Sequence, residues 1–208
     1  MKKIIALAVT MAAAVTMATA EITVGARGIF GLGLGTTVSS DFDDLGMEVD
    51  LGKSLDFGFA AFVKIPVWEA LGVQPELGFT HHQVGLKWDF GIVTLEGTGA
   101  INTIDLPVLV TYDIAINDAF SVTPFLGPQL SFPLGKVAMG GDFDGDGDID
   151  SKVLFSIVLG ANVSYKVGPG AIVGDLRYNL GLTPLKSDDT DMLTLRALLF
   201  SVGYQIQF

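Results

Sequence analysis

The final stretch of the chain, ALLFSVGYQIQF (197–208), alternates between two kinds of side chain. Every even-numbered position from Leu198 to Phe208 is large and apolar or aromatic, whereas the odd-numbered positions are mostly small or polar. Successive residues of a β-strand point to opposite faces, so this alternation predicts a strand with one apolar and one mainly polar face. Such a strand either buries its apolar face in a protein core or turns it toward lipid.

The same period of two recurs along the chain and predicts an all-β fold. It is plain in AIVGDLRYNLGLTPL (171–185), IDLPVLVTYDI (104–114) and VLFSIVLGANVSYKV (153–167). Over the whole chain the pattern predicts eight strands. Their approximate ranges are 22–36, 54–67, 73–87, 101–114, 119–133, 153–167, 171–185 and 193–208.

Mean hydropathy favours the lipid-facing alternative. The value of +0.53 is high for a water-soluble chain. Yet after residue 20 there is no apolar run of about 18 residues, the length that a membrane-spanning helix needs. In a bilayer, a closed barrel is the remaining way to hydrogen-bond every backbone group. We therefore expect an all-β, eight-stranded antiparallel up-and-down transmembrane β-barrel with polar side chains in its lumen.

The connections between the expected strands alternate in length. Those at 69–72, 115–118 and 168–170 are tight. The other connections are longer and contain most of the loop aspartates; they are 37–53, 88–100, 134–152 and 186–192. Short turns at one rim and long loops at the other are typical of outer-membrane barrels, in which the tight turns face the periplasm.

The beginning of the chain predicts export. A basic start (MKK), an apolar stretch and a small-residue ATA site before Glu21 indicate a signal peptide over 1–20 and one barrel domain over 21–208. Without Lys2 and Lys3, 10 basic and 23 acidic residues remain, a net charge of −13. That charge argues against nucleic acid as a partner. The absence of cysteine excludes disulfides and thiolate metal sites.

Four segments resemble the small eight-stranded outer-membrane barrels of the OmpX and PorT-like kind. They are PELGF (75–79), IDLPVLVTY (104–112), GDLRYNLGL (174–182) and the ending GYQIQF (203–208). The resemblance covers essentially all of the chain after residue 20 and implies residence in the outer membrane of a diderm bacterium. It also implies that the barrel-assembly machinery recognises the C-terminal strand, with Phe208 as the assembly signal. We expect a monomer surrounded by outer-membrane lipid.

The alternation places charges of both signs in the expected lumen. An eight-stranded barrel is only wide enough for its own side chains, and a charge away from water needs a partner. We therefore predict an ion-pair network across the lumen, with Arg177 near Glu76 or Asp105 at its centre. Because the two signs nearly balance, we interpret it as a structural plug rather than an ion path. The predicted lumen charges are Arg27, Lys64, Lys166 and Arg177 with Asp56, Glu76, Asp105, Asp113 and Asp175.

His81 and His82 are the only histidines, and they raise the question of an enzyme. An outer-membrane lipid hydrolase can use a histidine with a serine and an acid in the barrel wall. Neighbours on a strand face opposite sides, so His82 is expected to point inward and His81 outward, and their rings cannot share one metal. No serine stands in a G-x-S-x-G context. We therefore predict no catalytic residue and interpret the pair as rim histidines near lipid headgroups.

The segment GGDFDGDGDIDSK (140–152) has the spacing of a calcium-binding loop. Its first three aspartates and Gly147 match positions 1, 3, 5 and 6 of such a loop. Position 12 is Val153 instead of a bidentate glutamate, and no helices are expected to flank the segment, so it is not an EF-hand. Weak calcium binding and a solvated acidic turn both stay open. The candidate ligands are Asp142, Asp144, Asp146, Asp148 and Asp150.

The pattern as a whole favours a barrel without enzymatic activity that has a structural or surface-interaction role. Its external partner is not identified by the sequence, and no cofactor is expected apart from the calcium considered above. Two alternatives from other classes stay open: a narrow barrel that transports small or hydrophobic solutes, and a barrel-embedded lipid-modifying enzyme. Conductance in planar bilayers would indicate the first, and loss of lipid hydrolysis in His82→Ala would indicate the second.

Overall fold

Strands make up nearly all of the regular structure in the described part of the chain. The computed structural model describes residues 21–34, 48–52, 54–89, 94–141, 145–147, 153–187 and 190–208. The expected signal peptide lies outside these residues. No helix among the described residues is long and apolar enough to cross a membrane.

Eight long strands form the wall of the protein, each close to a range predicted from the alternation. They are β1 (Thr23–Gly33), β3 (Ser54–Trp68), β4 (Leu71–Asp89), β5 (Thr94–Tyr112), β7 (Phe120–Gly141), β9 (Leu154–Val167), β10 (Gly170–Gly181) and β13 (Arg196–Gln207). Five short strands lie at the two ends of this wall. They are β2 (Glu48–Gly52), β6 (Ile114–Ala115), β8 (Gly145–Gly147), β11 (Leu185–Ser187) and β12 (Thr190–Leu193).

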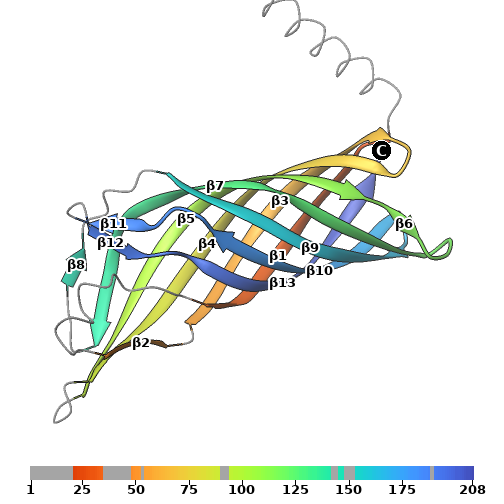
Figure 1. Cartoon of the computed structure of the whole chain (residues 1–208). Coiled ribbons are helices and arrows are strands. Elements are labelled where there is room, and N and C mark those ends of the chain that lie inside the picture. The colour runs from red at the N-terminus through yellow and green to blue at the C-terminus, as the bar shows by residue number, and fades with distance from the viewer. Residues whose placement is uncertain are drawn as a thin grey trace, which may run out of the picture.

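The wall closes on itself. Each long strand pairs antiparallel with the next in sequence, and the last pairs with the first, from Thr23↔Gln207 to Gly33↔Ala197. Figure 1 shows the strands tilted around one common axis. Closure leaves no free sheet edge in the wall, which is what a lipid environment requires. The predicted eight-stranded antiparallel β-barrel is confirmed.

Inward and outward side chains follow the predicted alternation. In β13, Ala197, Leu199 and Ser201 are buried, whereas Leu198 and Phe200 between them are exposed. The same pattern holds along β10, where Asp175 and Arg177 are buried and their neighbours Leu176 and Tyr178 face outward. Large apolar side chains therefore cover the outer surface, and polar side chains fill the inside.

Aromatic side chains gather at the end of the barrel that carries the tight turns. They come from different strands and lie on the outer surface, where interfacial aromatic residues anchor a barrel at the membrane boundary. The Tyr204 hydroxyl also donates to the Val167 carbonyl at 2.9 Å. The exposed aromatic residues at this end are Trp68, Tyr112, Tyr165, Tyr204 and Phe208.

The same end is closed by short connections, as predicted. Residues 69–70 join β3 to β4 with a positive φ at Glu69, and 168–169 join β9 to β10 with a positive φ at Gly168. Between β5 and β7, the Asn117 side chain accepts from the backbone N–H groups of Ala119 and Phe120. In Figure 1 this end holds β6 and the C-terminus.

The opposite rim differs from the prediction. Much of the expected loops 88–100 and 134–152 is strand, because β4 continues to Asp89, β5 begins at Thr94 and β7 continues to Gly141. The backbone pairing of β4 with β5 continues to the ends of both strands, with Asp89 opposite Thr94. The neighbouring strands β10 and β13 are shorter at this rim, because β10 ends at Gly181 and β13 begins at Arg196. The outer rim is therefore uneven, with β2 added to β4 and β8 added to β7 (Figure 1).

Candidate functional site in the barrel lumen

Four charged side chains meet in the middle of the lumen and form a closed ring of ion pairs. Arg27 of β1 contacts both Glu76 of β4 and Asp175 of β10. Arg177 of β10 donates to Glu76 at 3.1 Å and to Asp175 at 2.7 Å. The four side chains are only 1–4% exposed. Two positive and two negative charges thus neutralise one another away from water, the condition under which buried charges are tolerated.

Both arginines are also supported by phenylalanine rings. The guanidinium carbon of Arg27 lies 4.6 Å from the centroid of Phe62, and that of Arg177 lies 5.3 Å from the centroid of Phe125. A ring face attracts a cation and leaves the guanidinium edge free for carboxylates. Each arginine is therefore fixed by an aromatic contact as well as by its ion pairs.

Glycine on a neighbouring strand makes room for this cluster. Gly203 of β13 stands directly opposite Arg27. A Cβ atom at Gly203 would overlap the Ala26 carbonyl and press on the Arg27 side chain. Position 203 therefore needs glycine, because the backbone of β13 lies so close to the backbone of β1 and to the Arg27 side chain.

The structure brings Arg177 to one of its two predicted partners. It places Glu76 against Arg177, and Gln74 supports Glu76 by donating to it at 2.8 Å. Asp105 takes no part in the ring. It accepts instead from Thr80 at 2.6 Å and Thr103 at 3.0 Å. The alternation alone identifies inward residues, but the pairs across the lumen depend on the stagger of the strands.

A second polar network lies nearer the outer rim and is centred on His82. Its Nδ1 lies 3.0 Å from Asp56 Oδ2, and its Nε2 lies 3.3 Å from the Thr103 hydroxyl. Since Thr103 donates its hydroxyl proton to Asp105, its oxygen is left to accept from His82. Both ring nitrogens of His82 therefore face an acceptor, the Asp56 carboxylate on one side and the Thr103 hydroxyl on the other. The network joins β3, β4 and β5.

His82 points inward, as predicted, but the interpretation as a rim histidine near lipid headgroups is wrong, because the side chain is buried inside the lumen. The sequence did not predict its contacts with Asp56 and Thr103, because these depend on which strands are neighbours and on their register. His81 does face outward, and its Nδ1 lies 2.7 Å from Asn102 Oδ1. Its ring centroid is 4.7 Å from that of Phe57.

The remaining predicted lumen charges lie toward the tight-turn end. Lys64 donates to Asp113 at 2.6 Å, and Thr123 donates to the same carboxylate at 2.6 Å. This group is partly open to solvent, with Lys64 and Asp113 side chains 16% and 38% exposed. Lys166 is not a buried lumen residue, because it stands close to the end of β9 and is exposed. The lumen is therefore dry at its centre and wetter at this rim.

The arrangement of Asp56, His82 and Thr103 does not work as a catalytic triad. Thr103 is 0% exposed and its hydroxyl proton is directed to Asp105, so it has neither substrate access nor a free nucleophile. Among the described residues, no group of three histidine, aspartate or glutamate side chains is placed to hold a metal ion.

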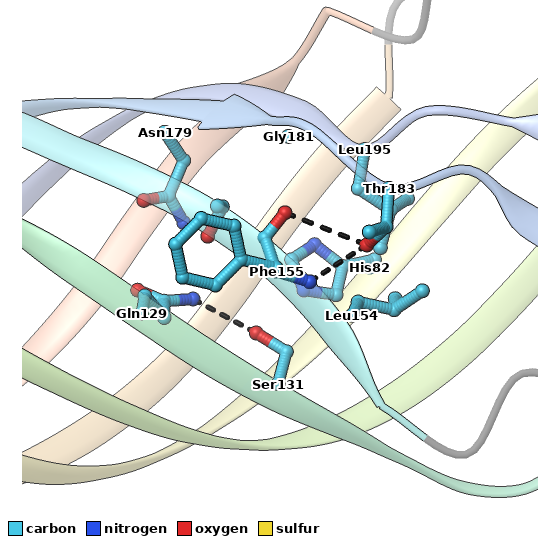
Figure 2. A pocket seen from close by; sticks show the side chains of 10 residues that line it. His82, Gln129, Ser131, Leu154, Phe155, Asn179, Gly181, Thr183 and Leu195 are labelled. Carbon is cyan, nitrogen blue, oxygen red and sulfur yellow. Dashed lines mark hydrogen bonds between the residues drawn. The ribbon is translucent and has the colours of Figure 1, made fainter.

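A small pocket opens above His82, at the outer end of the lumen. Its volume is about 20 Å³, enough for one water-sized group. Figure 2 shows side chains from several strands converging on it, with Gln129 hydrogen-bonded to Ser131 at 2.9 Å. The residues that line it are His82, Gln129, Ser131, Leu154, Phe155, Ser156, Asn179, Gly181, Thr183 and Leu195.

The expected calcium loop lies almost wholly outside the described residues. Four of its five aspartates, Asp142, Asp144, Asp148 and Asp150, are not described. Asp146 belongs to β8, whose backbone pairs with β7 at Ala138↔Asp146. Calcium binding stays a prediction.

An apolar outer surface, a charged and filled lumen and full closure define an integral outer-membrane barrel protein. The chain belongs to the outer membrane protein β-barrel domain family, whose family model matches residues 4–205. The protein therefore resides in the outer membrane of Gram-negative bacteria.

Solved structures similar to this chain are also outer-membrane proteins. OprG from Pseudomonas aeruginosa is 11% identical, with 91% of this chain and 96% of OprG covered at a TM-score of 0.57. Neisserial surface protein A is 17% identical, with 90% of this chain and 97% of that protein covered at a TM-score of 0.49. Ail of Yersinia pestis is 15% identical, with 89% of this chain and 99% of Ail covered at a TM-score of 0.42. No curated protein sequence matches the chain significantly. At such low identity the likeness to OprG concerns the fold alone.

Proposed function

We propose that this protein is a closed, non-conducting barrel that presents its external segments to partners at the cell surface and carries out no catalysis. The observation that supports the closed lumen best is the ring of Arg27, Glu76, Asp175 and Arg177. These side chains come from β1, β4 and β10, and they reach across the lumen. An ion that passed would have to break paired charges in a dry environment, at a cost of several kcal/mol (about 3–5 for one partner lost).

The external role is supported by where the chain concentrates its charge. Acidic runs such as DFDDLGMEVD (41–50) and DFDGDGDID (142–150) occur in the sequence between the long strands β1 and β3 and between β7 and β9, the connections opposite the tight turns. In outer-membrane barrels the end opposite the tight turns faces the exterior. A partner with a basic surface matches this charge, whereas polyanions would be repelled.

Conductance of the purified, folded barrel in planar bilayers tests the closed lumen. The wild type should show no steady channel. The variant Arg27→Ser/Arg177→Ser leaves Glu76 and Asp175 without cations, so water and small cations should enter and a cation-selective conductance should appear. Heat-modifiable gel migration checks that the variant is folded. A steady conductance in the wild type would overturn the proposal and favour a narrow transporter.

The surface role is tested by binding to immobilised, folded barrel. Partners captured by the wild type should be lost by a variant in which the five aspartates of 142–150 are asparagine, since that change removes charge without altering the barrel wall. Undiminished capture by the variant would mean that this segment is not the binding surface. Lipid hydrolysis by the wild type that His82→Ala abolishes would contradict the assignment as a non-enzyme.

A further inference from the structure

We propose that the pocket at the outer end of the lumen is a binding site for a small ammonium group, either ammonium itself or the amine of a small primary amine. This goes beyond the proposed surface role, because it assigns a specific small ligand to the barrel interior. Four features support it: an unpartnered buried acceptor, further polar side chains in the lining, two carboxylates close below the pocket and a size that matches one ammonium headgroup.

The first feature is the Asn179 side chain, which points into the pocket from β10 (Figure 2). It is only 8% exposed, and its Oδ1 has no hydrogen-bond partner. An amide oxygen left without a donor away from water is destabilising. A ligand that donates a hydrogen bond here would remove that penalty.

The second feature is the chemistry of the surrounding side chains. Ser131, Ser156 and Gln129 line the pocket beside Asn179, and the apolar side chains of Leu154, Phe155 and Leu195 complete the lining. Gln129 uses one amide N–H for Ser131. Hydroxyl oxygens accept hydrogen bonds, and an ammonium group has several donors to offer them and no acceptor of its own.

The third feature is charge. His82 lines the base of the pocket and contacts the Asp56 carboxylate directly and the Asp105 carboxylate through Thr103, so two carboxylates accompany this one imidazole. The deeper arginines are already neutralised by Glu76 and Asp175. Arg196 stands opposite Leu180 and, by the alternation of β13, on the face away from the buried Ala197. The pocket therefore favours a cation over an anion.

The fourth feature is size. A volume of about 20 Å³ accommodates one water-sized group, which is the size of an ammonium headgroup. The pocket rim is held by Thr183, whose Oγ1 accepts from the Phe155 N–H at 2.7 Å. The backbone N–H of Leu182 also donates to the Phe155 carbonyl at 2.9 Å. These two hydrogen bonds hold the segment that follows β10 against the start of β9.

The test is a titration of the folded wild-type barrel in detergent, followed by NMR chemical shifts of Asn179, Ser156 and Gly181. The probes are ammonium chloride, methylammonium chloride, tetramethylammonium chloride and sodium chloride at equal ionic strength. We expect saturable shifts with the first two probes and none with the other two. The size series is measured on the wild type, so the proposal is testable even if a variant fails to fold.

Asn179→Leu should weaken methylammonium binding at least tenfold, judged from the shifts of Ser156 and Gly181. Asn162→Leu is the matched control, because Asn162 is also a buried asparagine of the lumen but does not line the pocket. Methylammonium binding by the Asn162→Leu barrel should be unchanged. Equal responses to all four salts, or no saturable shift, would overturn the proposal and leave a single bound water as the occupant. Loss of binding in both variants would also overturn the role of Asn179. None of these outcomes affects the conductance test of the closed lumen.

Discussion

Arg177 and Glu76 are 101 positions apart in the sequence, yet their side chains meet at 3.1 Å inside the barrel. They stand on β10 and β4, which are four strands apart around an eight-stranded wall and therefore face each other across the lumen. Asp175, which is also on β10, and Arg27 of β1 complete the ring. This contact ties opposite sides of the barrel together, which the hydrogen bonds between neighbouring strands cannot do.

Removing Arg177 should therefore destabilise the barrel strongly. Arg177→Ala leaves the buried carboxylates Glu76 and Asp175 with Arg27 as their only cation in the ring, and such a loss costs about 3–5 kcal/mol. The measurement is urea unfolding of the barrel in lipid vesicles. Lys166→Ala is the control, because Lys166 is exposed and should change the free energy of unfolding by less than about 0.5 kcal/mol. An equally small effect of Arg177→Ala would mean that water screens the ring.

The faces of the strands could be predicted from the sequence, because in a strand the side chain direction depends only on odd and even position. That is why Asp175 and Arg177 were placed inside correctly. Which charges meet could not be predicted, since contacts across the lumen depend on strand stagger, and Asp105 was as good a partner for Arg177 as Glu76. The outer ends of β5 and β7 could not be predicted because their backbone pairing continues where the apolar alternation in the sequence stops.

His82 should matter for stability but not for catalysis. His82→Ala removes the donors to Asp56 and Thr103, and an unsatisfied buried acceptor costs about 1–3 kcal/mol, more for a charged one. His81→Ala changes the adjacent residue, which faces outward and loses only its contacts with Asn102 and Phe57, so a smaller effect is expected. Urea unfolding of both variants makes the comparison. A larger loss for His81→Ala would show that the inner network contributes little.

The C-terminal aromatic residue should act during assembly rather than in the folded wall. The Phe208 N–H donates to the Ile22 carbonyl at 2.8 Å, but its side chain is 76% exposed and has little packing to lose. Deletion of Phe208, or Phe208→Lys, should lower the amount of folded barrel in the outer membrane far more than Gln207→Lys does. Heat-modifiable migration of membrane fractions measures it. Equal yields from Phe208→Lys and Gln207→Lys would remove Phe208 as the assembly signal.

The segment 142–150 should bind calcium weakly from the external side. Its five carboxylates repel one another, and a divalent cation would offset that repulsion by taking several oxygen ligands. We expect a Kd of about 0.1–1 mM, the range of extracellular calcium modules. Binding to the folded state alone would raise stability by about 2.7 kcal/mol at a hundredfold excess over Kd, and by less at millimolar calcium.

Calorimetric titration of the folded barrel with calcium tests this, with Asp144→Asn/Asp146→Asn as the variant and magnesium as the competing ion. Saturable heat with calcium that the variant loses would establish a site. Magnesium should compete poorly, because it demands a near-octahedral set of ligands and gives up its waters reluctantly. No heat, or the same heat from magnesium and from the variant, would leave a solvated acidic turn. In either case the effect should be confined to the external rim, because the ring around Arg177 neutralises its own charges and does not depend on the cation.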